Sequence, residues 1–176
     1  RSLVGSEMCI RDSFVYIAAF GLFTEVSYKT SQQLKNIFGH VAYIMEGVKQ
    51  LRDIPSFRMQ VEYDGKVFQD EFIYGMVTNS VSVGGFKGMT GNDVKLDDGL
   101  FEVTLIRNPK NPIELNEILA CLTNMIDDSD LIYSFKTDAV HITAKEEVPW
   151  TLDGEFGGAH REVVIRNLKQ RVEIFC

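Results

Sequence analysis

The sequence of 176 residues contains few of the features that mark specialised classes of protein. No run approaches the length of about 18 apolar residues that a membrane-spanning helix needs. The three cysteines, Cys9, Cys121 and Cys176, follow neither a disulfide framework nor the spacing of a zinc site, which suits a reducing compartment. Positive charge is also scarce, since 18 Lys and Arg stand against 25 Asp and Glu for a net charge of −7, and no basic stripe is present. We therefore expect a soluble cytoplasmic protein with no nucleic acid as a main partner.

The residues that are present have the proportions of a globular domain. Hydrophobic residues make up 45 % and charged residues 24 % of the chain, which excludes the disordered and fibrous classes. At roughly 100–200 residues per domain, the length predicts one domain, large enough to bury about two thirds of its unfolded surface. The composition thus predicts a core that forms without disulfides.

The first twelve residues differ from the rest. Residues 1–12 (RSLVGSEMCIRD) show no hydrophobic period and no helix cap, and the pair Leu3-Val4 is too short for a signal peptide. We expect a non-native leader here and assign the domain to residues 13–176. Since the apolar run at 14–20 already has the pattern of a buried strand, we also expect that coding sequence is missing upstream.

Strands dominate the predicted secondary structure, with two inserted helices. A helical period starts at Ser31 and extends to about residue 53, and a second follows Pro112. Asp64-Gly65 is a strong hairpin signal between two of the strands. Because the strands lie too close together for crossover helices, we predict a mainly β (α+β) fold, a β-sandwich-like domain with two inserted helices. The predicted strands are at 14–20, 57–63, 66 onward, 72–78, 100–106, 131–135, 139–144, 148–152, 162–166 and 172–175.

The first loop with candidate functional residues is Lys95-Leu96-Asp97-Asp98-Gly99-Leu100. Asp-Gly before a strand is ordinarily a turn, because glycine adopts positive φ and aspartate bonds its own backbone. The alternative is a site for a hard cation. Mg²⁺ accepts backbone carbonyls and a single carboxylate, with waters completing its octahedron.

A second such loop runs from Trp150 to Gly158 and contains Asp153-Gly154-Glu155. Two carboxylates two positions apart at the end of a strand suit proton abstraction from a hydroxyl, or coordination around a phosphate-bound metal. The local alternative is again a hairpin turn with acidic residues. Neither loop is specific by itself.

With the two loops in this order and at this spacing, the chain resembles the C-terminal domain of the diacylglycerol kinase catalytic-domain family. This family includes soluble bacterial lipid kinases and the sphingosine kinases. The resemblance covers about residues 14–175. The matching stretches are Phe14–Gly21, 35–44 (KNIFGHVAYI), 77–80 (VTNS), 84–86 (GGF), 95–100 (KLDDGL) and 153–155 (DGE).

This resemblance implies the C-terminal half of a two-domain lipid kinase. Family members carry ATP mainly on an N-terminal nucleotide-binding domain with a Gly-Gly-Asp-Gly-Thr loop, and Gly84-Gly85 lacks the Asp-Gly-Thr that would follow. We therefore expect that the nucleotide-binding domain is absent from this chain, and that the chain alone does not turn over ATP.

The resemblance also implies roles for particular residues. The family's structural Mg²⁺ would be held by the backbone oxygens of Lys95 and Leu100 and the carboxylate of Asp98. Glu155 matches the catalytic acid/base, and Asp153 matches a group close to the phosphates or the acceptor hydroxyl. Which of these two carboxylates accepts the proton is left open by the sequence.

The implied activity is ATP-dependent phosphorylation of diacylglycerol to phosphatidic acid, by a cytoplasmic enzyme that meets the membrane surface transiently. A homodimer is one possible assembly of the complete enzyme. Two alternatives stand beside this reading: a kinase for another lipid acceptor, such as a sphingoid base or a glycolipid, and a non-enzymatic β-domain that binds lipid or nucleotide.

Overall fold

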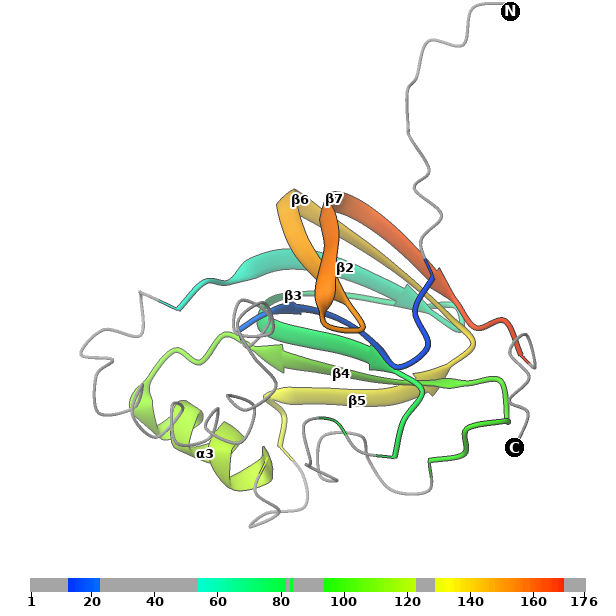
Figure 1. Ribbon diagram of the computed structural model, residues 1–176. Helices are drawn as coiled ribbons and strands as arrows, with labels where there is room; N and C mark the ends of the chain where they lie inside the picture. Colours follow the sequence, from blue (N-terminus) through cyan, green and yellow to red (C-terminus); the bar gives the residue numbers. More distant parts are fainter. Residues whose placement is uncertain (1–12, 23–53, 82, 84–93, 123–128, 170–176) are drawn as a thin grey trace, which may run out of the picture.

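The computed structural model describes residues 13–22, 54–81, 83, 94–122 and 129–169 (Figure 1). Within these ranges the fold is mainly β, as predicted. The elements are β1 (Ile17–Gly21), β2 (Phe57–Tyr63), β3 (Lys66–Thr78), β4 (Phe101–Arg107), α3 (Pro112–Leu122), β5 (Ile132–Thr137), β6 (Ala139–Leu152) and β7 (Glu155–Arg166).

The strands form one antiparallel sheet in the order β1-β6-β2-β3-β4-β5, and β7 adds to β6. The short strands β1 and β2 lie one after the other along β3: β2 pairs with its first half, from Lys66 to Phe72, and β1 with its last part, from Tyr74 to Thr78. Both also pair with β6. The sheet therefore curls, and Figure 1 shows β6 and β7 arching over β4 and β5.

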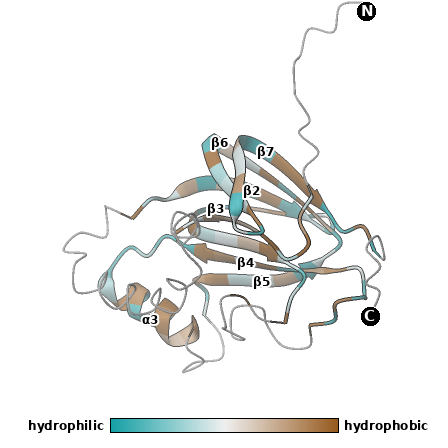
Figure 2. Ribbon diagram, viewed as in Figure 1, coloured by the Kyte–Doolittle hydropathy of each residue, from teal (hydrophilic) through white to brown (hydrophobic). Residues whose placement is uncertain are grey.

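The main core fills the inside of this curl. Alternate residues of each strand point inward, as Phe101, Val103 and Leu105 do on β4, and are buried there. The opposite face is also apolar, and it packs against Ile118 and Leu122 of α3. Figure 2 shows the apolar residues of β4, β5 and α3 in brown. The sheet is thus buried on both faces, which gives the sandwich-like layering expected from the sequence.

The helix predicted after Pro112 is confirmed as α3, and its first turn shows why it starts there. Oδ1 of Asn111 accepts the backbone N–H groups of Ile113 (3.0 Å) and Glu114 (2.9 Å). The carboxylate of Glu114 in turn accepts the N–H of Lys110 at 2.7 Å. Among the described residues, no helix has the length and apolar character needed to cross a membrane. The helix predicted at 31–53 and the strand predicted at 172–175 lie outside the described residues.

Some predicted strand boundaries are wrong. The strands expected from residue 66 and at 72–78 form one strand, β3, and those expected at 139–144 and 148–152 form one strand, β6. In β6 the pairing register shifts between Thr143 and Val148, so an irregularity interrupts the hydrophobic alternation without ending the strand. β7 begins at Glu155, well before the expected residue 162, because its polar, glycine-containing start pairs with β6.

Gly75 lies at a closely packed point of the inner core. It pairs with Phe20 on one side and with Leu105 on the other, and both of these side chains are fully buried. A Cβ at this position would overlap the Phe20 ring and lie 2.7 Å from Cδ2 of Leu105. Only a residue without a side chain fits here.

Gly75→Ala is therefore expected to lower the free energy of unfolding by about 1–3 kcal/mol, measured by urea denaturation, because a buried ring must move. Shortening the ring with Phe20→Leu in the Gly75→Ala background should give part of the loss back. Equal stability of Gly75→Ala and the parent chain would contradict this packing.

Candidate functional site

The predicted loop between Trp150 and Gly158 is a tight two-residue turn. Leu152 ends β6, Glu155 starts β7, and the two residues pair with each other. The residues between them have positive φ angles, 49° at Asp153 and 92° at Gly154, which is the conformation of a type I′ hairpin turn. The hairpin turn that the sequence left as the local alternative is therefore present, and the residues on both sides of it continue the strands.

The Asp153 carboxylate binds the backbone at the start of β1. Its Oδ1 accepts the N–H groups of Tyr16 (2.9 Å) and Ile17 (2.8 Å), and its Oδ2 accepts that of Val15 (2.8 Å). The Asp153 N–H donates to the Ile17 carbonyl at 2.8 Å. Both carboxylate oxygens therefore have protein donors, and Asp153 fixes β1 against the turn.

Glu155, on the other side of the same turn, is exposed. Its carboxylate has no hydrogen-bond or ion-pair partner in the part of the chain that the structure describes. The next residue, Phe156, is also exposed, with 61 % of its surface accessible. Of the two acids predicted to act here, Glu155 is the one whose carboxylate is available to another molecule.

The other predicted loop, residues 95–100, lies before β4. Oδ1 of Asp98 accepts the N–H of Leu100 at 2.9 Å, which closes a small turn around Gly99 with φ of 85°. The carbonyl of Leu96 accepts Nδ2 of Asn79 (3.2 Å), and that of Asp98 accepts Nζ of Lys169 (3.3 Å). The ordinary turn chemistry expected of Asp-Gly is therefore present.

The remaining oxygen atoms of this loop are suitable ligands for a hard cation. The second carboxylate oxygen of Asp98 and the carbonyls of Lys95 and Leu100 have no protein partner among the described residues. All three are oxygen ligands, of the kind that Mg²⁺ takes together with water. No group of three or more His, Cys, Asp or Glu side chains in the described ranges is arranged around a metal, so a cation here would depend on backbone carbonyls and water.

The structure brings the two loops to the same end of the strands, which we call the Glu155 edge. Ile17, at the start of β1, pairs with Thr78 at the end of β3, and Thr78 pairs with Glu102 at the start of β4. The carbonyl of Tyr16 accepts both the Thr78 hydroxyl (2.6 Å) and the Asn79 N–H (3.3 Å). Because Asn79 also bonds Leu96, a continuous set of hydrogen bonds joins the Asp153 turn to the Asp98 loop.

Sequence reasoning missed Glu102 at this edge. Its side chain is buried, with both carboxylate oxygens lacking a hydrogen bond in the described structure and Oε1 lying 3.6 Å from Nζ of Lys136. Burial raises the pKa of Glu102; the positive charge of Lys136 opposes the shift, and the negative charge of Asp98 adds to it. The signal available in the sequence was an acid inside the apolar run 100–106.

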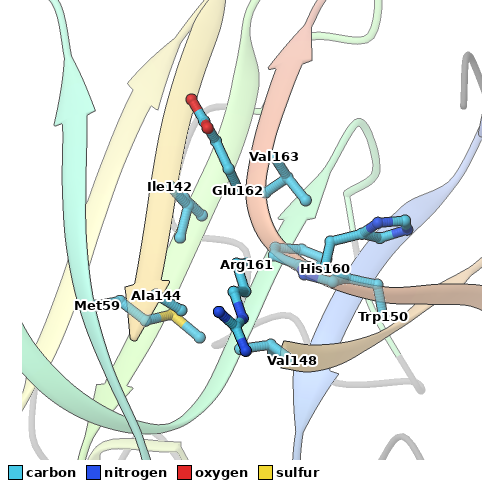
Figure 3. A pocket seen from close by; sticks show the side chains of 9 residues that line it. All are labelled: Met59, Ile142, Ala144, Val148, Trp150, His160, Arg161, Glu162 and Val163. Carbon is cyan, nitrogen blue, oxygen red and sulfur yellow. The ribbon is translucent and has the colours of Figure 1, made fainter. Parts of the chain in front are cut away.

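A hollow between β6 and β7 offers no further site. Figure 3 shows its lining, with Arg161 extending toward Val148 and with His160 and Glu162 pointing away. The space left by the described side chains is too small for a water molecule. Nearby Trp150 is buried and packs against Phe20 with ring centroids 5.0 Å apart, which anchors the strand before the Asp153 turn.

Comparison with known proteins identifies the family of this domain. Residues 18–174, which include both loops, match the family described as the YegS C-terminal NAD kinase beta sandwich-like domain. The chain belongs to this family. The predicted resemblance to the C-terminal domain of bacterial diacylglycerol kinases is thereby confirmed.

Among relatives of this YegS C-terminal domain, a protein named diacylglycerol kinase from Staphylococcus carnosus (strain TM300) is 36 % identical over 164 residues, which cover 92 % of this chain and 52 % of the relative. A diacylglycerol kinase from Bacillus subtilis (strain 168) is 34 % identical over 147 residues, covering 82 % and 48 %. The crystal structure of a candidate diacylglycerol kinase from Bacillus anthracis str. Sterne superimposes with a TM-score of 0.64 at 25 % identity, covering 89 % of this chain and 51 % of that one. The chain spans about half the length of the curated relatives it matches.

The Asp98 loop makes a prediction for metal binding. Mg²⁺ should raise the thermal unfolding temperature of the chain, equivalent to about 2.7 kcal/mol when its concentration is about 100 times Kd. Asp98→Asn keeps the Oδ1 acceptor for Leu100 but removes the charge, so the Mg²⁺-dependent increase should disappear. Asp97→Asn, an exposed neighbour, is the matched control and should retain it. A Mg²⁺ effect that survives in Asp98→Asn would rule out this ligand.

Proposed function

We propose that this chain is the C-terminal, lipid-binding and catalytic-base part of an ATP-dependent kinase that phosphorylates diacylglycerol to phosphatidic acid. The observation that carries the proposal is the exposed carboxylate of Glu155, which has no partner among the described residues and lies at the same end of the strands as the Asp98 loop. The names of the relatives from Staphylococcus carnosus and Bacillus subtilis support the choice of acceptor.

In the proposed mechanism, Glu155 accepts the proton of the acceptor hydroxyl while the hydroxyl oxygen attacks the terminal phosphorus of ATP. The bond from that phosphorus to the bridging oxygen breaks, and ADP leaves. Phosphoryl transfer depends mainly on positioning and charge neutralisation, with one carboxylate to take the proton. Such a base contributes about 10²–10⁴-fold to the rate. Its exposed place beside the β6–β7 turn lets it reach a hydroxyl presented from outside this chain.

For Asp153 we propose a positioning role. The prediction that it lies beside the phosphates stays a prediction, because its observed contacts are with the backbone of Val15, Tyr16 and Ile17. By fixing the turn against β1, Asp153 sets the direction in which Glu155 leaves the sheet. A substitution here would then act on transfer through the geometry of Glu155.

The Lys95, Asp98 and Leu100 oxygens are proposed to hold a structural Mg²⁺. When bound, the ion supplies positive charge beside the carboxyl groups of Asp98 and Glu102. The chain's own residues do the rest: Asn79 and Lys169 hold the loop through the carbonyls of Leu96 and Asp98.

Exposed apolar side chains near the turn support a lipid acceptor and transient contact with a membrane surface. Val15 and Tyr16, which bond Asp153, have 67 % and 40 % of their surfaces accessible, and Phe156 follows Glu155. Leu96, on the Asp98 loop, is 58 % accessible. Apolar side chains in these positions suit acyl chains better than a polar substrate.

The proposal is tested by joining the N-terminal half of the Staphylococcus carnosus diacylglycerol kinase to residues 13–176 of this chain. The fusion should transfer phosphate from ATP to diacylglycerol. Glu155→Gln should lower the rate by about 10²–10⁴-fold without changing the unfolding temperature, because an exposed, unpartnered side chain adds little to stability. A folded fusion that keeps its full rate with Glu155→Gln would refute the assignment.

The same fusion separates the alternative acceptors. Equal amounts of diacylglycerol, a sphingoid base and a glycolipid are offered together, and the phosphorylated products are compared. Diacylglycerol should be the preferred acceptor. Preference for either of the other lipids would contradict diacylglycerol as the substrate but would not affect the assignment of Glu155 as the base.

A further inference from the structure

A second polar site lies at the other end of the sheet. A cavity of about 450 Å³ opens among the start of β2, the first half of β3, the end of β4 and the middle of β6. β4 starts beside the Glu155 edge and ends at the cavity, so its seven residues separate the two by about 20 Å. The lining residues are Arg58, Gln69, Asp70, Glu71, Arg107, Asn108, Lys110 and Lys145.

The lining is positively charged in a chain whose net charge is −7. Among the described lining residues, four are cationic (Arg58, Arg107, Lys110 and Lys145) and two are acidic (Asp70 and Glu71). Of these carboxylates, Asp70 is fully engaged by protein donors, since Oδ1 accepts the Glu71 N–H at 2.8 Å and Oδ2 accepts Nε of Arg107 at 2.7 Å. The Tyr133 hydroxyl adds a third bond to Oδ2 at 3.1 Å.

Arg107 is held in place for use by a ligand. Asp70 engages its Nε, and the carbonyl of Asp130 accepts Nη1 at 3.3 Å. A guanidinium carries five N–H donors, so this support leaves others to face the cavity. A fixed arginine loses little freedom when it binds an anion, which is how arginine recognises phosphate in many proteins.

The other three cations of the described lining form no close ion pair, although Glu71 lies opposite Arg58 in the pairing of β2 with β3. In the described part of the chain, Arg58, Lys110 and Lys145 make no ion pair, and the remaining acid, Glu71, accepts the Ser56 hydroxyl at 2.6 Å. Clustered like charges repel one another unless an anion lies between them. The Asn108 carboxamide, whose Oδ1 is buried without a partner among the described residues, adds a polar group to the same wall.

We propose that this cavity binds the phosphate group of a small anionic ligand, carried by a soluble compound or by a lipid headgroup. Cations that converge from several strands match the several oxygens of a phosphate, with Arg107 as the pre-oriented donor. The inference does not depend on the proposed kinase activity, since the cavity shares no residue with the Glu155 edge.

The test measures binding to the 176-residue chain by calorimetry and vesicle co-sedimentation. The probes are inorganic phosphate, pyrophosphate, and phosphatidylcholine vesicles with and without phosphatidate. The variant Arg58→Gln/Lys145→Gln removes two cations of the cavity, and Lys66→Gln/Arg166→Gln removes two exposed cations elsewhere as the matched control. Lys110→Gln serves as a second variant should the double substitution disturb folding.

We expect saturable binding of at least one phosphate probe with a Kd below about 1 mM, weakened about tenfold or more by the cavity variants and unchanged in the control. Binding of pyrophosphate alone would identify a soluble ligand, and binding only of phosphatidate vesicles a lipid headgroup; both support the proposal. No saturable binding of any probe, or equal weakening in the cavity and control variants, would overturn it.

Discussion

The candidate site depends on one interaction, the acceptance of three backbone N–H groups by the Asp153 carboxylate. β1 is only five residues long, and this contact fixes its start to the β6–β7 turn. The Tyr16 carbonyl then holds Thr78 and Asn79, and Asn79 holds the carbonyl of Leu96. Through these hydrogen bonds, the Asp153 carboxylate at the turn is linked to the loop that contains Asp98.

The carboxylates of this edge differ in their surroundings, and the difference assigns their roles. Asp153 has all its oxygens bonded by the backbone, Asp98 closes a turn with one oxygen, and Glu102 is buried with its pKa raised by that burial. Of these four, Glu155 is the exposed carboxylate that has no partner within the described ranges. At the far end of β4, by contrast, the described residues that line the cavity include more cations than carboxylates.

Much of this could be predicted from the sequence. The strands expected at 57–63 and 100–106 correspond to β2 and β4, the Asp64-Gly65 signal corresponds to the turn between β2 and β3, and the loops singled out at 95–100 and 153–155 lie at the same end of the strands. The role of Asp153 could not be read, because it depends on β1, more than 130 residues away in the chain. The early start of β7 and the continuity of β6 were missed because glycines and an irregular register hide the alternation. The cationic cavity joins residues from four strands, which no local pattern brings together.

The claim that Asp153, and not Glu155, holds the start of β1 is tested most directly by amide hydrogen exchange at Val15, Tyr16 and Ile17, measured by NMR. If Asp153 holds the start of β1, these amides are protected in the parent chain and in Glu155→Ala, and they lose protection in Asp153→Ala while the core of β3 keeps it. Unprotected amides in the parent chain, or protection that survives in Asp153→Ala, would contradict the account.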